Sequence, residues 1–488
     1  MSKYLLGIDI GTSACKVVLF DFDGNVLAAQ SQEYSVYFPS QGYAEQNPDE
    51  WWTSVCSAVR TLISNSGINS ADIGGIGIDG QSWSAIAVDK SGQALCNTPI
   101  WMDNRASDIC EELLKTIDED SLFSLCGNPL KPSYTLPKVV WYKKNLPDVY
   151  KNTDKILQSN SYIVFKMTGK ITQDKSQGYG WQCFDMRKCQ WDKDMCKDFG
   201  INPYFLPEIM ECHDIAGAVT REAAAMTGLC EGTPVVAGGL DAACATLGAG
   251  VVSHGQTQEQ GGQAGGMSIC TDTYTADKRL ILSTHAASGK WLLQGGTVGG
   301  GGVLRWFDRE FGSGDFKALD TLAAEVISGS DGVLFLPYMA GERSPIWNPD
   351  AKGIFYGLDY SKTKGHMIRA MLEGVAFSLK HNLDIAEQSG LCAEKLFAVG
   401  GAANSPLWMQ IKADVTQKPL EIPFSDSAAA LGAALLAGVG TGVYNDFDHA
   451  VSKTVKITKK YAPNTENAEI YNNMYERYLE LYTRIETF

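Results

Sequence analysis

The stretch Tyr4–Asp23, YLLGIDIGTSACKVVLFDFD, decides the fold of this chain. It is an apolar run that ends in Asp9, turns through Gly11-Thr12-Ser13 and resumes as an alternating strand from Lys16. Asp23-Gly24 then gives a strong hairpin signal. An acid at the end of a buried strand, beside a glycine loop with N–H groups and hydroxyls, can hold a phosphate and its cation. An ordinary hairpin with an edge carboxylate has the same pattern, so both interpretations stay open at this point.

The composition is that of a globular protein with more than one domain. The chain has 488 residues, of which 44% are hydrophobic and 20% charged, and this length exceeds one ordinary core. The net charge of −15 argues against nucleic acid or an anionic membrane as a partner.

The cysteine pattern and the apolar segments indicate the cellular compartment of the protein. The 13 cysteines form no C-x-x-C pair, and the group Cys183, Cys189, Cys196 and Cys212-His213 fits no zinc spacing. Incidental thiols in a reducing cytosol are therefore expected. The N-terminus shows no signal-peptide pattern, and the uncharged stretch Ser427–Asn445 is rich in small residues, which predicts a buried helix with an exit turn. We expect a cytoplasmic protein.

Strands alternate with helices in the first half of the chain. Asn47-Pro48-Asp49-Glu50 is a helix start, and apolar residues at helical spacing continue to Gly67. Ile73–Asp79 is predicted to be a buried strand that leads into Gly80-Gln81-Ser82-Trp83. This alternation predicts an α/β sheet with covered faces, in which ligands gather at the strand ends.

The middle of the chain is less regular. Helices are expected near Asp108–Lys115, Leu136–Asn145 and Glu222–Thr227, and residues 176–200 suggest an inserted lobe over the site. The segment Gly250–Gly255 is the predicted boundary, which gives domains of residues 1–250 and 251–488.

Glycine turns recur after strands in both halves. A second acid, Asp241, ends the strand before it in Gly238-Gly239-Leu240-Asp241, and further glycine turns stand at residues 261–266, 299–302 and 400–401. Glycine lets a ligand approach the main chain, and N–H groups at helix starts bind phosphate oxygens, so four such turns favour a nucleotide. The chain contains no Walker motif and no G-x-G-x-x-G with its downstream acid, which argues against P-loop and Rossmann folds. The segment KLFAVGGAAN at 395–404 repeats the pattern of residues 73–83, which indicates that the two halves of the chain are duplicated folds. A terminal helix is predicted at Ala468–Ile485.

These residues resemble the FGGY family of carbohydrate kinases from Leu5 to about Gly438. The matching motifs are Gly7-Ile8-Asp9-Ile10-Gly11-Thr12 with Lys16, Lys138-Val139-Val140-Trp141, Gly238-Gly239-Leu240-Asp241, Leu336-Pro337-Tyr338 with Gly341-Glu342-Arg343-Ser344-Pro345-Ile346-Trp347, Gly353-Ile354-Phe355-Tyr356-Gly357-Leu358, His366-Met367-Ile368-Arg369-Ala370-Met371-Leu372-Glu373-Gly374 and Gly400-Gly401-Ala402. The resemblance implies a two-domain, actin-like ATPase fold of the α/β class with a ribonuclease-H-like mixed sheet in each domain. It also implies that ATP and a small sugar or polyol lie in the interdomain cleft.

The resemblance assigns roles to individual residues. Asp241 is the implied general base that takes the proton from the attacking sugar hydroxyl, and Asp9 is implied near the Mg²⁺-bound phosphates. The implied ATP-binding residues are Asp9, Gly11, Thr12, Ser13, Lys16, Gly262, Gln263, Gly301, Arg305, Gly401, Ala402, Asn404 and Ser405. The implied cofactors are therefore ATP and Mg²⁺.

Two departures from the family concern the ligands. Gly262-Gln263-Ala264-Gly265 stands where many members carry Gly-Thr-Ser-Gly, so an amide replaces a hydroxyl donor. Gly80-Gln81-Ser82-Trp83 stands where xylulokinases usually carry Gly-Gln-Met-His, so an indole replaces an imidazole. Gln81, Ser82, Trp83, Asp103 and Asp241 are the expected sugar contacts, and a substrate other than plain D-xylulose is expected.

The sequence thus predicts an ATP-dependent kinase of a small sugar, ketose, sugar acid or polyol. Two alternatives stay open: a nucleotide-dependent sensor or chaperone-like ATPase of the same fold, and an FGGY relative that has lost activity. The identity of the sugar, the phosphorylated hydroxyl, allosteric control and the oligomeric state, with a homodimer among the options, are not determined by the sequence.

Overall fold

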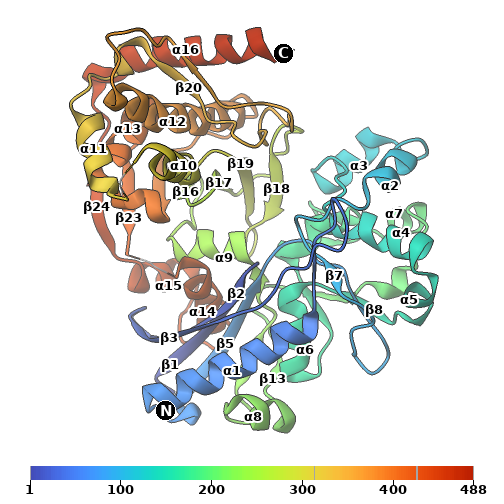
Figure 1. Cartoon of the computed structure of the whole chain (residues 1–488). Helices are drawn as coiled ribbons and strands as arrows, with labels where there is room; N and C mark the ends of the chain where they lie inside the picture. The colour runs from blue at the N-terminus through green and yellow to red at the C-terminus, as the bar shows by residue number, and fades with distance from the viewer. Residues whose placement is uncertain (1, 313, 425–426, 487–488) are drawn as a thin grey trace. The chain divides into compact units, whose positions relative to one another are not determined.

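The computed structural model describes residues 2–312, 314–424 and 427–486, and the chain forms two compact units (Figure 1). The first unit contains residues 2–252, Leu282–Leu292 and Ser427–Val455. The second unit contains Ser253–Ile281, residues 293–424 and residues 456–486. This division differs from the predicted domains of residues 1–250 and 251–488, because two later segments fold with the first unit.

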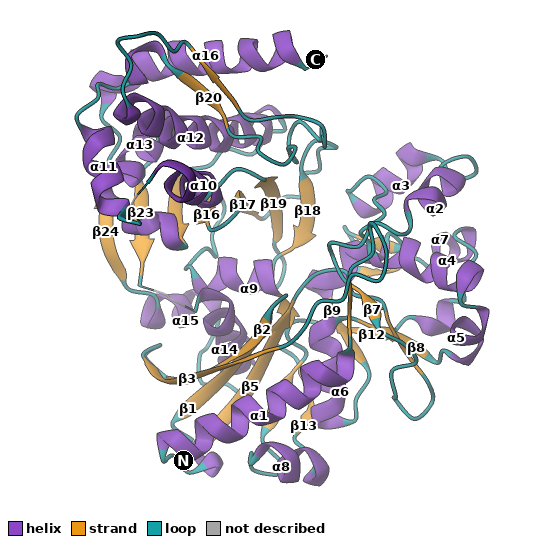
Figure 2. Ribbon diagram, in the orientation of Figure 1, coloured by secondary structure: helices purple, strands orange, loops and turns teal. Residues whose placement is uncertain are grey.

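A mixed sheet forms the centre of the first unit (Figure 2). Among the described residues it has seven strands in the order β13-β14-β5-β1-β2-β3, and β15 also pairs with β5. The strands are β1 (Tyr4–Ile10), β2 (Ala14–Asp21), β3 (Val26–Glu33), β5 (Ile73–Gly80), β13 (Ile215–Ala218), β14 (Pro234–Val236) and β15 (Gly239–Leu240). Strands β1, β14 and β15 run parallel to β5, whereas β2 is antiparallel to β1. The carboxyl ends of β1, β5 and β15 therefore meet at one edge of the sheet.

The second unit repeats this arrangement. Strand β16 (Gln256–Gly261) forms a hairpin with β17 (Gly265–Thr271) and pairs in parallel with β22 (Lys395–Val399). Strand β23 (Leu420–Pro423) is parallel to β22, and β24 (Ile457–Tyr461) is antiparallel to β23. Strands β16, β17 and β22 thus pair as β1, β2 and β5 do, which confirms the repetition predicted from residues 73–83 and 395–404.

Helix α14 (Ala428–Gly440) explains why a late segment belongs to the first unit. The helix packs on β1, β5 and α9 (Asp241–Gly248). A Cβ atom at Gly7 would lie 1.9 Å from the carbonyl oxygen of Ala430, and one at Gly77 would lie 1.8 Å from that of Ala433. The strand glycines therefore let the helix backbone approach the sheet closely. This confirms the buried helix predicted within Ser427–Asn445.

The predicted helices of the first unit are present with small shifts in their ends. They are α1 (Pro48–Ser66), α2 (Ser107–Leu113), α4 (Thr135–Asn145) and α8 (Arg221–Thr227), and the predicted terminal helix of the second unit is α16 (Ala468–Ile485). The side chain of Asn47 caps α1 by accepting from the N–H of Asp49, and Gly67 ends the helix in the left-handed conformation. Residues 176–200 form short elements, namely the 3₁₀ turn η2 (Lys175–Trp181), β10 (Phe184–Asp185), β11 (Gln190–Trp191) and α7 (Lys193–Asp198).

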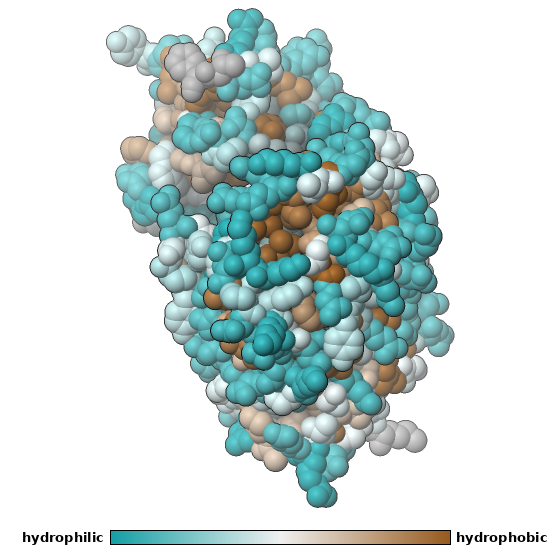
Figure 3. Space-filling model, turned by 90° about the vertical axis from the view of Figure 1, so that its right-hand side faces the viewer, coloured by the Kyte–Doolittle hydropathy of each residue, from teal (hydrophilic) through white to brown (hydrophobic). Residues whose placement is uncertain are grey.

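Polar side chains cover most of the molecular face shown in Figure 3. Within the described ranges, every helix is too short or too polar to cross a lipid bilayer.

Candidate active site

Three carboxyl groups gather at the strand ends of the first unit. Asp9 lies at the end of β1 and is paired with Asp79 of β5 in the parallel ladder. Asp241 directly follows β15, whose residues pair with Asp79 and Gly80, and it begins helix α9. Its Oδ1 atom accepts a hydrogen bond of 2.6 Å from the N–H of Ala242. The structure therefore brings the predicted acids Asp9 and Asp241 to the same edge of the sheet.

Asp79 is an acid that the sequence analysis did not assign to the site. It is fully buried and its carboxyl group is in hydrogen-bond contact with that of Asp9. No described residue donates a hydrogen bond to its two oxygens. A signal was available, because Gly7-Ile8-Asp9 and Gly77-Ile78-Asp79 are the same tripeptide, and the two copies pair residue for residue.

Burial and mutual repulsion separate the protonation states of these acids. Burial, together with the charges of Asp9 and Asp241, raises the pKa of Asp79 well above its usual range. Burial also raises the pKa of Asp9, but Asp79 and Lys16 act in the opposite direction. Two carboxyl groups in contact can bond only when one is protonated, so we infer that the proton resides on Asp79 and that Asp9 is a carboxylate. Burial and the charge of Asp9 raise the pKa of Asp241 to about 7.

The loop between β1 and β2 lies next to these acids. Its residue Thr12 accepts a hydrogen bond of 2.9 Å from the indole N–H of Trp101 and donates at 3.4 Å to the side-chain oxygen of Gln81. Ser13 is exposed, and Lys16 is the partner of Asp9 in the β1–β2 ladder. The loop is thus tied to neighbouring segments through Thr12. Trp101 was not predicted to take part in this site.

The predicted sugar contacts differ in their surroundings. The amide of Gln81 is buried and donates a hydrogen bond of 2.7 Å to the side chain of Gln46. Trp83 is in the left-handed conformation with a φ of 59°, and its ring centroid lies 4.7 Å from that of Tyr134 and 5.8 Å from that of Tyr179. The side chain of Ser82 is half-buried beside Trp83.

Asp103, the fifth predicted sugar contact, is bonded within the protein. Its carboxylate accepts from the guanidinium of Arg105 at 2.8–3.0 Å and from the N–H of Ala44 at 2.7 Å, and the side chain is fully buried. Arg105 also bonds Glu45 at 2.7 Å. Because both oxygens of Asp103 are engaged within the protein, we interpret it as a residue that fixes the loop and not as a sugar contact.

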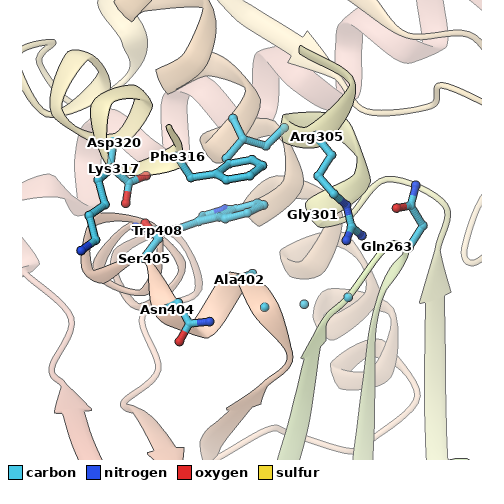
Figure 4. Close-up of a pocket in the computed structure, with 14 residues that line it drawn as sticks. Gln263, Gly301, Arg305, Phe316, Lys317, Asp320, Ala402, Asn404, Ser405 and Trp408 are labelled. Carbon is cyan, nitrogen blue, oxygen red and sulfur yellow. Dashed lines mark hydrogen bonds between the residues drawn. The ribbon is translucent and has the colours of Figure 1, made fainter. Parts of the chain in front are cut away.

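A cavity of about 390 Å³ lies in the second unit (Figure 4). Eight predicted nucleotide-binding residues line it together: Gly262, Gln263, Gly301, Arg305, Gly401, Ala402, Asn404 and Ser405. Gly261, from the predicted glycine turn 261–266, also lines it, and sequence reasoning missed five further residues of its wall, which are Leu304, Phe316, Lys317, Asp320 and Trp408. These five belong to helices α10 (Gly301–Phe311), α11 (Phe316–Ala324) and α13 (Pro406–Thr416), where no glycine turn marked them.

The two ends of the cavity differ in chemistry. Arg305 and Gln263 lie at one end, next to Gly301, whereas the rings of Phe316 and Trp408 and the carboxylate of Asp320 lie towards the other (Figure 4). Burial raises the pKa of Asp320, and a hydrogen bond with Ser405 opposes this rise. One end of the cavity therefore carries Arg305 and Gln263, and the other carries two aromatic rings with the side chains of Asp320 and Lys317.

The glycines at 299–302 have a packing role that the sequence analysis did not predict. The N–H of Gly301 donates to the carbonyl of Gly262 at 2.8 Å, and that of Gly302 donates to Gln263 at 2.9 Å. A Cβ atom at Gly302 would lie 2.3 Å from the Nε2 atom of Gln263. The first N–H groups of α10 are therefore bonded to the neighbouring loop, so the expectation that they bind phosphate is not supported here.

Comparison with known proteins agrees with this geometry. Residues 4–248 match the N-terminal domain of the FGGY family of carbohydrate kinases, and residues 265–441 match its C-terminal domain. The xylulose kinase of Bacillus subtilis is 31% identical over 484 residues, covering 99% of this chain and 97% of the relative. The gluconokinase of Bacillus licheniformis is 30% identical over 499 residues, covering 100% of this chain and 97% of the relative.

A solved structure shows the same architecture. The crystal structure of xylulose kinase from Rhodospirillum rubrum superposes with a TM-score of 0.93, at 30% identity and 99% coverage of both chains. The two mixed sheets are thus those of the two-domain, actin-like ATPase fold. This chain therefore belongs to the FGGY family of carbohydrate kinases, enzymes that transfer a phosphoryl group from ATP to a sugar hydroxyl.

Proposed function

We propose that this chain phosphorylates a small neutral sugar, a ketose or polyol, with Asp241 as the general base. The observation that carries the proposal is the environment of Asp241, where burial and Asp9 raise the pKa to about 7. A base whose pKa lies near the working pH combines a large ionised fraction with a strong drive to take a proton. Asp241 can therefore accept the proton of the sugar hydroxyl as that hydroxyl attacks.

Asp9 suits the role of a magnesium ligand. Its carboxylate is the hard oxygen donor that Mg²⁺ prefers, and this ion is commonly held by one or two carboxylates with phosphates and water. The described ranges hold no cluster of three or more His, Cys, Asp or Glu side chains with metal-binding geometry, which agrees with such a sparse set. When bound, the ion would neutralise phosphate charge. Asp79 holds the Asp9 carboxylate by donating a hydrogen bond to it.

The cavity of the second unit suits ATP in one orientation. Phosphate oxygens need cations and N–H donors, so we place them at the end that carries Arg305 and Gln263. A carboxylate repels phosphate but accepts from a base amino group, so the base is placed towards Asp320, Phe316 and Trp408. Gln263 can supply an amide N–H where many relatives carry a hydroxyl.

The charges beside the predicted sugar segments favour a neutral substrate over a sugar acid. The ammonium of Lys138 bonds two backbone carbonyls, and Arg105 is engaged by Asp103 and Glu45. These cations are thus committed within the protein. The indole of Trp83 offers an apolar face of the kind that packs on the C–H surface of a sugar.

The test is ADP release from Mg-ATP across pentuloses, hexuloses, polyols and sugar acids, with Asp241→Asn as the matched variant. Turnover with one neutral sugar that is lost in the variant is the expected result. Turnover confined to sugar acids would contradict the substrate class. ATP hydrolysis that no sugar stimulates would support a sensor or chaperone-like ATPase, and loss of both ATP binding and turnover would support an inactive relative.

A further inference from the structure

Side-chain donors hold the backbone that follows β5. Gln177 donates to the carbonyls of Gly80 and Gln81 at 3.1 and 3.2 Å, and Ser159 donates to Gln81 at 2.8 Å. This segment, residues 80–85, carries the predicted sugar contacts Gln81, Ser82 and Trp83. Its carbonyls are therefore fixed by residues far away in the sequence, as in a site whose geometry is set before the ligand arrives.

One face of helix α4 holds the second half of the same segment. Thr135 donates to the carbonyl of Ser84 at 3.3 Å, and Tyr142 donates to that of Ala85 at 2.9 Å. Lys138 lies between them on the helix and donates to the carbonyl of Trp83 at 3.0 Å. The spacing of three and four residues places all three donors on one helix face.

Lys138 differs from its two neighbours because it reaches a second segment. Its ammonium also donates to the carbonyl of Ile100 at 2.7 Å, directly before Trp101. Trp101 in turn donates to Thr12 of the predicted phosphate loop at 2.9 Å. Lys138 is fully buried, and its amino group carries at least two N–H donors whether or not it is protonated, enough for both carbonyls.

The backbone at Trp83 needs such support. A non-glycine residue in the left-handed region is uncommon, and it persists only where the surroundings hold it. The ring of Trp83 is also tightly enclosed, since a Cβ atom at Gly180 would lie 2.3 Å from its Cδ1 atom. A small shift of the Trp83 carbonyl would therefore move the indole against η2.

We propose that Lys138 is a positioning residue that fixes the Trp83 and Trp101 segments relative to each other and so sets the affinity for the sugar. This inference rests on the proposed function, because it assumes that these segments bind the sugar. Lys138 itself touches backbone carbonyls and not the reacting atoms. Its removal should therefore weaken sugar binding much more than ATP binding, because eight of the predicted nucleotide contacts line the cavity of the second unit and only Thr12 is linked to Lys138, through Trp101.

The test compares Lys138→Met with Lys143→Met on the same helix, whose ammonium bonds the exposed carbonyl of Gly200. KM and kcat are measured for the sugar identified by the panel and for ATP. We expect Lys138→Met to raise the sugar KM by about 10- to 100-fold, the cost of a misplacement near 1 Å, and the ATP KM by much less. Lys143→Met should change neither constant. An unchanged sugar KM in Lys138→Met, or an equal rise for both substrates, would overturn the proposal.

Two further variants guard against a purely structural effect. Tyr142→Phe removes one hydrogen bond to the same segment without touching the Ile100 carbonyl, so its sugar KM should rise much less. A rise equal to that of Lys138→Met would overturn the proposal in favour of general loosening of α4. Lys138→Gln retains an amide donor and should give an intermediate KM. If both Lys138 variants fail to fold, the residue serves stability and the proposal is wrong.

Failure of the proposed function is distinguishable from failure of this inference. Sugar binding to the wild-type protein is followed by tryptophan fluorescence in addition to turnover. A wild-type protein that neither binds nor phosphorylates any sugar overturns both. A wild-type protein with normal sugar turnover, together with a Lys138→Met variant of equal sugar KM, overturns only the role of Lys138.

Discussion

Asp9 and Asp79 are paired across the parallel ladder of β1 and β5, and the carboxyl group of the fully buried Asp79 is in hydrogen-bond contact with that of the half-buried Asp9. Two ionised carboxylates in contact with each other would repel strongly inside the protein. The pair is therefore stable when Asp79 is protonated and donates to Asp9. This arrangement leaves one negative charge where the magnesium ligand is proposed.

Asp79→Asn should be well tolerated, because the amide N–H can donate to Asp9 in place of the carboxyl proton. We expect its free energy of unfolding to stay within about 1 kcal/mol of the wild type, whereas Asp79→Ala should lose about 1–3 kcal/mol with the bond. Urea unfolding at neutral pH measures both. Equal losses in the two variants would contradict a protonated Asp79.

The pH dependence of turnover should follow Asp241. As a base it must be ionised, so kcat/KM should fall about tenfold per pH unit below its pKa of about 7. Asp241→Asn should lose about 10²- to 10⁴-fold in kcat while it still binds ATP. The measurements run from pH 5, about two units below this pKa, to pH 8, about one unit above it. A value of kcat/KM that stays constant over this range would exclude Asp241 as the base.

Ionisation of Asp241 is needed for turnover but lowers the stability of the fold. Its pKa is raised from 3.8 in the reference state to about 7 in the fold, so its stabilising contribution is complete below 3.8 and is lost as the pH rises through about 7. Asp241→Asn should therefore melt at a higher temperature than the wild type in mildly alkaline buffer. Differential scanning calorimetry measures this, and a variant less stable than the wild type there would contradict it.

Arg305→Ala should weaken ATP binding alone. Loss of a charged hydrogen bond to phosphate costs about 1.5–3 kcal/mol, which corresponds to about 10- to 150-fold in the KM for ATP. The control is Arg309→Ala on the same helix, whose guanidinium pairs with exposed Glu310. Steady-state kinetics give the KM for ATP and for the sugar in both variants. A similar effect of both arginine variants would place the phosphates elsewhere.

Gly77→Ala should destabilise the first unit, because the new methyl group would meet the carbonyl of Ala433 at 1.8 Å. Overpacking of this kind costs about 1–3 kcal/mol or more. Gly401→Ala is the contrasting variant, since no atom lies within 4 Å of its added Cβ. Its melting temperature should be unchanged, but its methyl group enters the nucleotide cavity and should raise the KM for ATP.

His285 should contribute to acid unfolding. The ring is buried, its Nε2 atom bonds the carbonyl of Val251, and burial lowers its pKa from 6.5 to about 4. Because the unfolded chain binds the proton first, stability is complete above 6.5 and falls by up to about 3 kcal/mol as the pH approaches 4. His285→Gln should flatten this decline, and the exposed His449→Gln should not. Urea titrations at several pH values test this.

The sequence analysis located residues correctly in the fold where their position depends on local patterns. Asp9, Asp241 and the glycine turns follow apolar strands, so their neighbours along the chain were enough to find them. Asp79 is the last residue but one of β5, as Asp9 is of β1, and it was missed because its repetition of the Gly-Ile-Asp tripeptide becomes meaningful only through strand pairing. The bond between Asp103 and Arg105, two residues later, was not predicted, because the sequence does not show that the two side chains meet. Phe316, Asp320 and Trp408 lie on helices without any local signal for a ligand.

The packing of α14 on β1 and β5 has a consequence for synthesis on the ribosome. When Val252 has emerged, the strands that carry Asp9 and Asp79 are complete, but the glycine-lined face of their sheet still lacks its helix. That face can be covered only after strands β16, β17, β22 and β23 of the second unit have been translated, because α14 follows them in the chain. The first unit therefore cannot finish folding as an N-terminal piece, and its maturation must wait for nearly the whole chain.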